Sequence, residues 1–324
     1  MATYAGVDLG ATNVRAVVGD ETGEVTSSAF NPTPQGPNGI AVTEAILDTL
    51  RDVCRGTDLD PDQLSAVGIG SFGPLDLAGG AVENPANLPD TIDRIPLTGP
   101  VSKLVDSESV HLHNDTTAGV IGERFYSDRN PDDMAYLTVS SGIGAGIAVD
   151  GNVLAGWDGN VGEVGHLTVD PSGYMPCGCG IDGHWEAYCS GTSIPMYAAH
   201  LLEDDPVETT LNMDDPEFSA ADVFEAAEDG DEFACGVLER VGRWNAVGVA
   251  NIVHAYAPLV IYVGGAVTLN NPDWVLDPVA ERIDDLVMSN VPDIQLTTLG
   301  EEVVVRGALA SALTGGTGDR DRLP

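Results

Sequence analysis

The chain has 324 residues, an apolar fraction of 43% and a formal net charge of −38, from 51 acidic and 13 basic residues. This length allows two domains with substantial cores. The charge disfavours a nucleic-acid partner, because binding to phosphate backbones requires a basic surface. The acidic residues are spread along the chain, which is typical of a surface that works in molar salt, where repulsion between like charges is screened. A partner with a basic surface is the alternative explanation.

The sequence also predicts the compartment. No run of 18 apolar residues occurs, and the chain enters a predicted strand without a basic and apolar signal sequence. The five cysteines are an odd number, and two of them are separated by one residue, unlike a secreted disulfide framework. We therefore expect a cytoplasmic protein with no membrane partner.

Two segments that lie 132 residues apart share one pattern. Residues 4–19 indicate a strand, a glycine turn and a second strand, and the same order returns at 136–151. Six of the 16 positions are identical, at residues 4, 7, 10, 16, 17 and 19 of the first segment. We infer an internal duplication that gives two related α/β domains, each with a glycine-rich turn.

The two glycine turns together predict a site for the phosphates of a nucleotide. Backbone N–H groups can approach an anion where no side chain intervenes. Asp8 would bind Mg²⁺, directly or through water, and Thr12 would reach a phosphate. Either turn alone would be an ordinary hairpin. The expected nucleotide contacts are Asp8, Gly10, Ala11, Thr12, Asn13, Ser141, Gly142, Gly264 and Gly265.

Two other glycine patterns do not indicate nucleotide folds. Residues 68–73 match G-x-G-x-x-G, but Pro74 and a predicted hairpin at 75–82 follow where a Rossmann fold requires a helix. The P-loop motif requires a lysine after its glycines, and the one lysine of the chain, Lys103, lies elsewhere.

Polar residues follow an extended run at 110–113. Asn114 and Asp115 come directly before a predicted helix at 116–125. Ligands of α/β folds bind beyond the carboxyl ends of strands, so these two residues are placed for chemistry. An N-cap role for Asp115 is the structural alternative. The loop at 84–89 contains Asn87, which could face a hydroxylated ligand or serve the turn itself.

Residues 161–191 concentrate three cysteines, two histidines and two glutamates. His166, Cys177, Cys179 and His184 form a set of two thiolates and two imidazoles that suits tetrahedral zinc. Cys189 is an alternative ligand to His184. The alternative without a metal site is a glycine-rich loop with incidental cysteines, or a pair of reduced thiols.

The second half of the chain is predicted from its periodicity. We expect helices at 192–202, 219–227 and 233–257, an exposed acidic connector at 203–217 and a buried strand at 259–263. Small residues at 264–266 would let an adenine lie against the backbone, although a plain strand-to-helix turn explains them equally well. A helix at 307–313 is expected to pack on the first domain, and the tail at 314–324 to be frayed.

With these motifs in place, the chain resembles the ROK family of sugar kinases and repressors, part of the actin-like ATPase superfamily. The resemblance runs nearly end to end. It implies an α/β fold, the duplicated two-domain actin-like ATPase (ribonuclease H-like) fold with an interdomain cleft. Residues 1–116 with 308–324 would form the small domain and residues 117–307 the large one. The matching motifs are Asp8-x-Gly10-x-Thr12, Asn87-Leu-Pro89, Asn114-Asp115, the turn at 140–146, Glu163-x-Gly-His166, Cys177-x-Cys179-Gly-x-x-Gly-His184-x-Glu186 and Gly264-Gly265.

The resemblance also implies an activity. A kinase of this kind transfers a phosphoryl group from ATP with Mg²⁺ to a hexose, here glucose to give glucose 6-phosphate, and Asp115 would be the general base. One ring nitrogen of His166 would bind a structural Zn²⁺ and the other would face the sugar. Homodimers or homotetramers are expected. The expected substrate contacts are Ser71, Asn87, Asn114, Asp115, Glu163, His166 and Glu186.

Two positions depart from the family pattern. His184 stands where the family has a third cysteine of the motif, which leaves the fourth metal ligand open. Asp90-Thr91 replaces the frequent Gly-Trp after Pro89, which bears on sugar selectivity.

Several alternatives stay open at this point. The sugar could be fructose, mannose or an N-acylated hexosamine, and the donor could be ADP or polyphosphate. A sugar-sensing regulator without catalysis is the alternative from another class, but ROK repressors carry a DNA-binding segment before the first strand, and only three residues precede Tyr4 here. A zinc hydrolase would need an open coordination position, which four protein ligands close.

Overall fold

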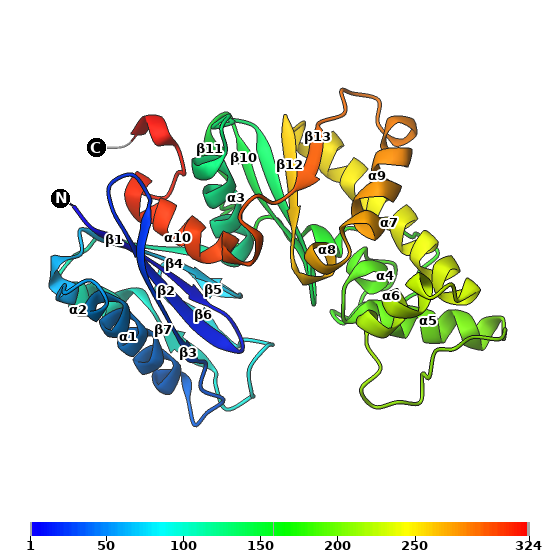
Figure 1. Cartoon of the computed structure of the whole chain (residues 1–324), viewed down its shortest axis with the longest axis horizontal. Coiled ribbons are helices and arrows are strands. Elements are labelled where there is room, and N and C mark those ends of the chain that lie inside the picture. Colours follow the sequence, from blue (N-terminus) through cyan, green and yellow to red (C-terminus); the bar gives the residue numbers. More distant parts are fainter. Residues whose placement is uncertain (1, 158, 323–324) are drawn as a thin grey trace. The chain divides into compact units, whose positions relative to one another are not determined.

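The structure of the chain, a computed structural model, describes residues 2–157 and 159–322 (Figure 1). Contacts between residues divide the chain into two compact units. The first consists of Met1–Asp132, Gly146–Val161 and Glu302–Pro324, and the second of Asp133–Ala145 and Gly162–Glu301. The predicted functional domain boundaries at 116 and 308 stay a prediction. By contacts, residues 117–132 group with the first unit.

The first unit is built on a five-stranded sheet of order β3-β2-β1-β4-β8. Strands β1, β4 and β8 are parallel, β2 is antiparallel to β1, and β3 is antiparallel to β2. A small antiparallel sheet, β5-β6-β7, follows β4 in the chain. The strands are β1 (Tyr4–Leu9), β2 (Asn13–Gly19), β3 (Val25–Pro32), β4 (Ala66–Ser71), β5 (Leu75–Asp76), β6 (Ala81–Glu83), β7 (Arg94–Pro96) and β8 (Val110–Asn114).

The two faces of this sheet belong to two different cores, because successive side chains of a strand point to opposite faces. Ala5, Val7 and Leu9 of β1 pack in a core with α1 (Gly39–Arg55) and α2 (Thr98–Val105). Tyr4 and Val17 pack in the other core, with residues of α3 (Asp115–Tyr126) and α10 (Val303–Thr314). The predicted packing of the closing helix on the first domain is therefore confirmed.

Helix α10 approaches the sheet at glycines. A Cβ on Gly6 would overlap the carbonyl oxygen of Val305, and one on Gly68 would overlap that of Ala308. Gly307 of α10 itself has no room for a Cβ beside the backbone of α3. Glycine at these positions permits a backbone-to-backbone approach that any side chain would prevent.

The second five-stranded sheet has the order β11-β10-β9-β12-β13. Strands β9, β12 and β13 are parallel, and β10 and β11 are antiparallel to each other. Each strand thus takes the place of its counterpart in β3-β2-β1-β4-β8, which confirms the predicted duplication. The strands are β9 (Met134–Val139), β10 (Ile143–Val149), β11 (Asn152–Val153), β12 (Val260–Gly264) and β13 (Asp293–Leu296).

The helices of the second unit hold the segment at 161–191 in place. Trp185 is fully buried, its Nε1 donates to Asn245 Oδ1 of α7 at 2.9 Å, and Gly248 leaves room for its ring. Helix α7 also packs against α9. The helices are α4 (Glu186–Cys189), α5 (Ser193–Asp204), α6 (Ala220–Glu228), α7 (Glu232–Tyr256), α8 (Ala266–Asn270) and α9 (Pro272–Leu286).

Most elements predicted from periodicity are confirmed. The predicted helices at 116–125, 192–202, 219–227 and 233–257 correspond to α3, α5, α6 and α7, and the predicted hairpin at 75–82 is β5 and β6. Helix α10 begins four residues earlier than expected. In the described part of the chain, no helix is long and apolar enough to cross a membrane.

The predicted fraying of the tail is wrong for its described residues, which end at 322. The guanidinium of Arg124 is 1% exposed and donates to the carbonyl oxygens of Gly151 at 2.9 Å and Thr317 at 3.1 Å. It also lies 2.7 Å from the Asp132 carboxylate and 3.7 Å from that of Asp319. The tail is therefore tied to α3 through a buried charge. Residues 323 and 324 of the prediction lie outside the described residues.

We expect Arg124→Leu to lower the free energy of unfolding by roughly 3 kcal/mol, because it removes the partner of two carboxylates and of two carbonyl groups. Arg51→Leu is the matched control. Its ion pair with Asp48 has the same 2.7 Å length, but both side chains are exposed, and such pairs contribute less than about 1 kcal/mol. Equal losses for the two variants in chemical denaturation in molar KCl would contradict the role given to Arg124.

Candidate functional site

The first glycine turn joins β1 to β2. Gly10 N donates to Asn13 O at 3.0 Å, which closes the turn. Thr33, after β3, braces it twice, with its N on Thr12 O at 2.8 Å and its Oγ1 on Gly10 O at 2.7 Å. Gln35 Nε2 donates to Ala11 O at 3.0 Å. The carbonyl groups of the turn are thus held from one side, and this fixes the direction of its N–H groups.

Three parallel strands end together beside this turn. In the register of the sheet, Leu9 lies opposite Ser71, and Ser71 lies opposite Asn114. The predicted residues Asp8, Asn114 and Asp115 are therefore brought to one edge of the first unit, where ligands of α/β folds bind. Ser71, the last residue of β4, is fully buried, and its Oγ donates to Phe72 O at 3.0 Å.

Helix α3 begins at this edge with Asn114 as its N-cap. Asn114 Oδ1 accepts from Thr116 N at 3.0 Å and from Thr116 Oγ1 at 2.8 Å. Asp115 is the first residue of the helix, and its Oδ1 also accepts from Thr116 N, at 2.7 Å. The alternative that made Asp115 the N-cap is therefore wrong, since Asn114 has that role. The positive end of the helix dipole favours the charged form of a carboxylate at this position.

The electrostatics of the edge are dominated by two carboxylates. Burial and the nearby charge of Asp115 raise the pKa of Asp8, Arg15 lowers it, and the net result is a pKa of about 7. The repulsion shows that Asp8 and Asp115 are close enough to interact. Two carboxylates in a half-buried position favour a cation between or beside them.

Asn87 lies in the loop between β6 and β7 and is exposed. The loop is anchored at its base by Asn84 N, which donates to Asp93 O at 2.7 Å, and by the buried side chain of Leu88. Asp90 and Thr91, which replace the frequent Gly-Trp, are exposed in the same loop. The loop thus presents Asn87 to solvent in the first unit.

The second glycine turn, in the second unit, joins β9 to β10. Ser140 N donates to Gly142 O at 2.9 Å, and Gly191 N donates to Ser140 O at 2.7 Å. Ile143 N donates to a carboxylate oxygen of Glu186 at 2.9 Å. Glu186 and Gly191, at the end of the segment 161–191, therefore brace this turn, as the residues that follow β3 brace the first one.

Gly264 and Gly265 end β12 beside the second turn. Gly265 has φ +88°, and a Cβ there would overlap the carbonyl oxygen of Val139, the last residue of β9. A Cβ on Gly264 would lie 2.6 Å from the hydroxyl of Tyr136. Both positions require glycine, and they leave bare backbone next to the turn that Ser141 and Gly142 form.

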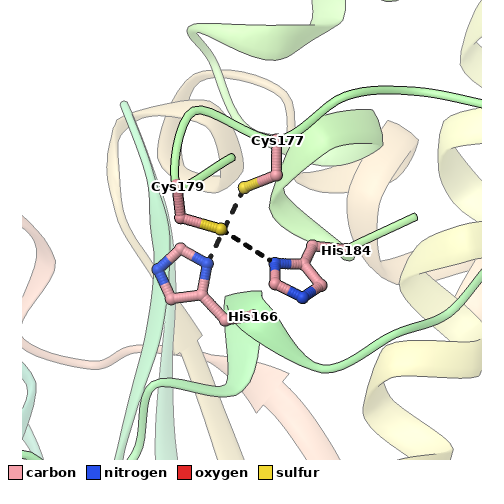
Figure 2. A group of neighbouring side chains, drawn as sticks. All are labelled: His166, Cys177, Cys179 and His184. Carbon is pink, nitrogen blue, oxygen red and sulfur yellow. Dashed lines mark hydrogen bonds between the residues drawn. The ribbon is translucent and has the colours of Figure 1, made fainter. Parts of the chain in front are cut away.

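The four predicted metal ligands come together. In Figure 2 the side chains of His166, Cys177, Cys179 and His184 point toward one another, and their ligand atoms all lie within 4.8 Å of one another. Cys177 Sγ is 3.7 Å from His166 Nδ1, and Cys179 Sγ is 3.2 Å from His184 Nδ1. Donor atoms around a tetrahedral zinc ion are about 3.3–3.8 Å apart, so the cluster has the donor set and nearly the spacing of a structural zinc site.

Cys189 does not belong to this cluster. It is fully buried in α4, and its Sγ donates to Val241 O of α7 at 3.3 Å. The choice that the sequence left open between His184 and Cys189 is thus decided in geometry for His184.

His166 joins the cluster to the predicted sugar contacts. Its Nδ1 faces Cys177, while its Nε2 lies 4.0 Å from the Glu163 carboxylate. Burial raises the pKa of Glu163, Glu186 raises it further and His166 lowers it, so the three side chains are neighbours. A ring fixed at one nitrogen by a metal presents the other in a set direction.

The braces of both turns were missed by the sequence analysis. Thr33 and Gln35 reach a turn that lies 23 and 24 residues earlier, and Glu186 reaches across 43 residues to Ile143. No local pattern marks such residues, because sheet pairing and packing bring them into place.

Comparisons with known proteins agree with this geometry. The chain is 36% identical over 312 residues to the glucokinase of Pyrobaculum calidifontis, covering 96% of this chain and 95% of that protein. Among solved structures it is similar to the ROK hexokinase of Thermus thermophilus, with a TM-score of 0.81, 30% identity and coverage of 95% and 97%. It is also similar to the ROK glucokinase of Streptomyces griseus in complex with glucose and AMPPNP, with a TM-score of 0.74, 28% identity and coverage of 95% and 98%.

The fold is accordingly the duplicated α/β fold of the actin-like ATPases. The model of the ROK family matches residues 4–314, nearly the whole chain, and the chain therefore belongs to the ROK family.

Proposed function

We propose that the chain transfers the γ-phosphoryl group of ATP to the 6-hydroxyl of glucose. The observation that carries the proposal is the position of Asp115, which begins α3 at the strand edge beside Asp8 and the first glycine turn. The names of the relatives support the same reaction, since one is a glucokinase and one neighbour was solved with glucose and an ATP analogue.

Asp115 is the general base of this proposal. Its carboxylate accepts the proton of the attacking sugar hydroxyl as the bond to phosphorus forms. The remaining work is positioning and stabilisation of charge, which requires no catalytic lysine. The sugar hydroxyls are held by Asn87, Asn114, Glu163, His166 and Glu186, while the buried Ser71 is not among these contacts.

The nucleotide is held by the two glycine turns and by Gly264 and Gly265. Asp8 would hold Mg²⁺, which would supply neutralisation of the phosphate charge. The pKa of about 7 for Asp8 fits this role, because a bound cation would favour the ionised form of a buried carboxylate.

Zinc has a structural role in the proposal. His166, Cys177, Cys179 and His184 supply four protein ligands, which close the coordination sphere and leave no position for a reacting water. With the metal held by these four residues, the ring of His166 and the segment that carries Glu186 would be fixed in place. The expected homo-oligomer, the salt-rich environment and the cytoplasmic location stay predictions.

The substitution Asp115→Asn tests the proposal. In a coupled assay with glucose, ATP and Mg²⁺ in molar KCl, we expect wild-type turnover and a loss of kcat of about 10²–10⁴ in the variant, the usual effect of removing a general base. Glucose binding, measured by calorimetry, should persist. The exposed Asp62→Asn serves as the control with unchanged kcat. Full kcat in Asp115→Asn would remove Asp115 from the mechanism, and a folded wild type that binds glucose without turnover would favour a sugar sensor.

The pKa of Asp8 predicts a pH dependence of nucleotide binding. A carboxyl with a pKa near 7 is mostly protonated at pH 6 and mostly ionised at pH 8, so its ionised fraction rises about tenfold. The affinity for Mg·AMPPNP should rise with pH across this window. The phosphates of the ligand can also titrate in this range, and the variant Asp8→Asn measures their contribution. This variant should bind weakly, and its affinity should lack the additional rise with pH that Asp8 causes. The same pH profile in both proteins would contradict the role of Asp8.

The metal cluster predicts one zinc ion per chain after dialysis against metal-free buffer, measured by mass spectrometry. His184→Ala should lose the metal and unfold at a lower temperature, because it removes one of four ligands. Cys189→Ala, also a buried position in this segment, should keep the zinc. Loss of zinc from Cys189→Ala with retention in His184→Ala would reverse the assignment.

A further inference from the structure

The second glycine turn is tied to the residues after the His/Cys cluster by three hydrogen bonds. Gly191 N donates to Ser140 O at 2.7 Å and Thr192 N donates to Ser141 O at 3.4 Å. The third bond runs from Ile143 N to Glu186 Oε2 at 2.9 Å, and it is the one made by a side chain. A backbone donor on an ionised carboxylate makes a stronger bond than the two neutral ones.

Glu186 also packs on the turn itself. A Cβ on Gly142 would lie 2.8 Å from the same oxygen, Glu186 Oε2. The carboxylate thus occupies the space that a side chain at position 142 would take, and it accepts from the next residue. The shape of the turn from Ser140 to Ile143 depends on this carboxylate being in place.

The position of Glu186 is set by its chain neighbours. Two residues earlier, His184 Nδ1 lies 3.2 Å from Cys179 Sγ in the cluster (Figure 2). The intervening Trp185 is fully buried and donates to Asn245 of α7. The cluster, Trp185, Glu186 and the turn therefore form one continuous contact path inside the second unit.

We infer that Glu186 is a positioning residue for the phosphate turn, in addition to its expected contact with the sugar. Through it, the metal state of the His/Cys cluster sets the affinity for nucleotide even when no sugar is bound. This inference rests on the proposed function, in which the turn at 140–143 holds the nucleotide phosphates.

Titration calorimetry with Mg·AMPPNP in the absence of sugar tests the inference. Glu186→Ala removes the acceptor of Ile143 N, and a charged hydrogen bond of this kind corresponds to roughly a tenfold weakening of binding. Glu186→Gln keeps an acceptor oxygen, so its affinity should fall by no more than about threefold. Removal of a negative charge beside an anion would by itself tighten binding, so the predicted sign separates positioning from simple electrostatics.

Glu163→Ala is the matched control. Glu163 is the other expected carboxylate contact of the sugar, and it lies against His166 rather than against the turn. Its loss should raise the KM for glucose and leave sugar-free nucleotide binding unchanged. Glu186→Ala should raise the KM for both substrates. Removal of the metal from the wild type by a chelator should weaken nucleotide binding, as Glu186→Ala does. In the Glu186→Ala variant, the same treatment should weaken nucleotide binding little further.

Unchanged or tighter nucleotide binding by folded Glu186→Ala would overturn the inference, as would an equal loss in Glu163→Ala. If Glu186→Ala does not fold, Gly142→Ala tests the same contact from the turn, because its Cβ displaces the carboxylate, and unchanged binding there would overturn the inference equally. A wild type that turns over glucose but shows no link between metal content and nucleotide affinity refutes the inference alone. A folded wild type that binds no nucleotide refutes the proposed function and the inference with it.

Discussion

The shared register of three parallel strands is the constraint on which the edge that carries Asp8 and Asp115 depends. Three parallel strands end in register, and this register brings a carboxylate at the end of β1 to the start of α3. Burial and the second charge raise the pKa of Asp8 to about 7. Helix α10 packs closely on the same sheet, where Gly6 and Gly68 leave no room for a Cβ. A cation bound beside Asp8 would favour the ionised form of this carboxylate.

In the second unit, the His/Cys cluster and its neighbours hold the glycine turn and His166 in place. Its glycine turn is braced by the residues near the cluster, with Gly191 on Ser140 and Glu186 on Ile143. The cluster fixes His166 at one ring nitrogen, and the other nitrogen lies toward Glu163. The replacement of a cysteine by His184 preserves four donors, since His184 Nδ1 takes its place beside Cys179. One small cluster of side chains and its chain neighbours thus hold both His166 and the second glycine turn in place.

Much of this architecture could be predicted from local patterns. The two glycine turns, the duplicated strand order, the helices of 12 and 25 residues that became α5 and α7, and the four cluster ligands all carry a signal in their spacing. Other features carry none. The bond of Arg124 to Thr317 spans 193 residues, and it orders a tail whose glycines and charges indicated fraying. The hydrogen bond from Ile143 to Glu186 likewise arises from packing. The sequence predicted Glu186 only as a contact of the sugar.

The measurement that tests the central claim most directly is kcat/KM for ATP-dependent phosphorylation of glucose, fructose, mannose, N-acetylglucosamine and N-acetylmannosamine, in molar KCl with Mg²⁺. Polyphosphate and ADP are compared with ATP as donors. The account predicts a clear preference for glucose with ATP. Preference for another sugar would keep the mechanism and move the substrate, which the exposed Asp90 and Thr91 beside Asn87 would then have to explain. No turnover with any sugar or donor by folded, zinc-loaded protein would contradict the account.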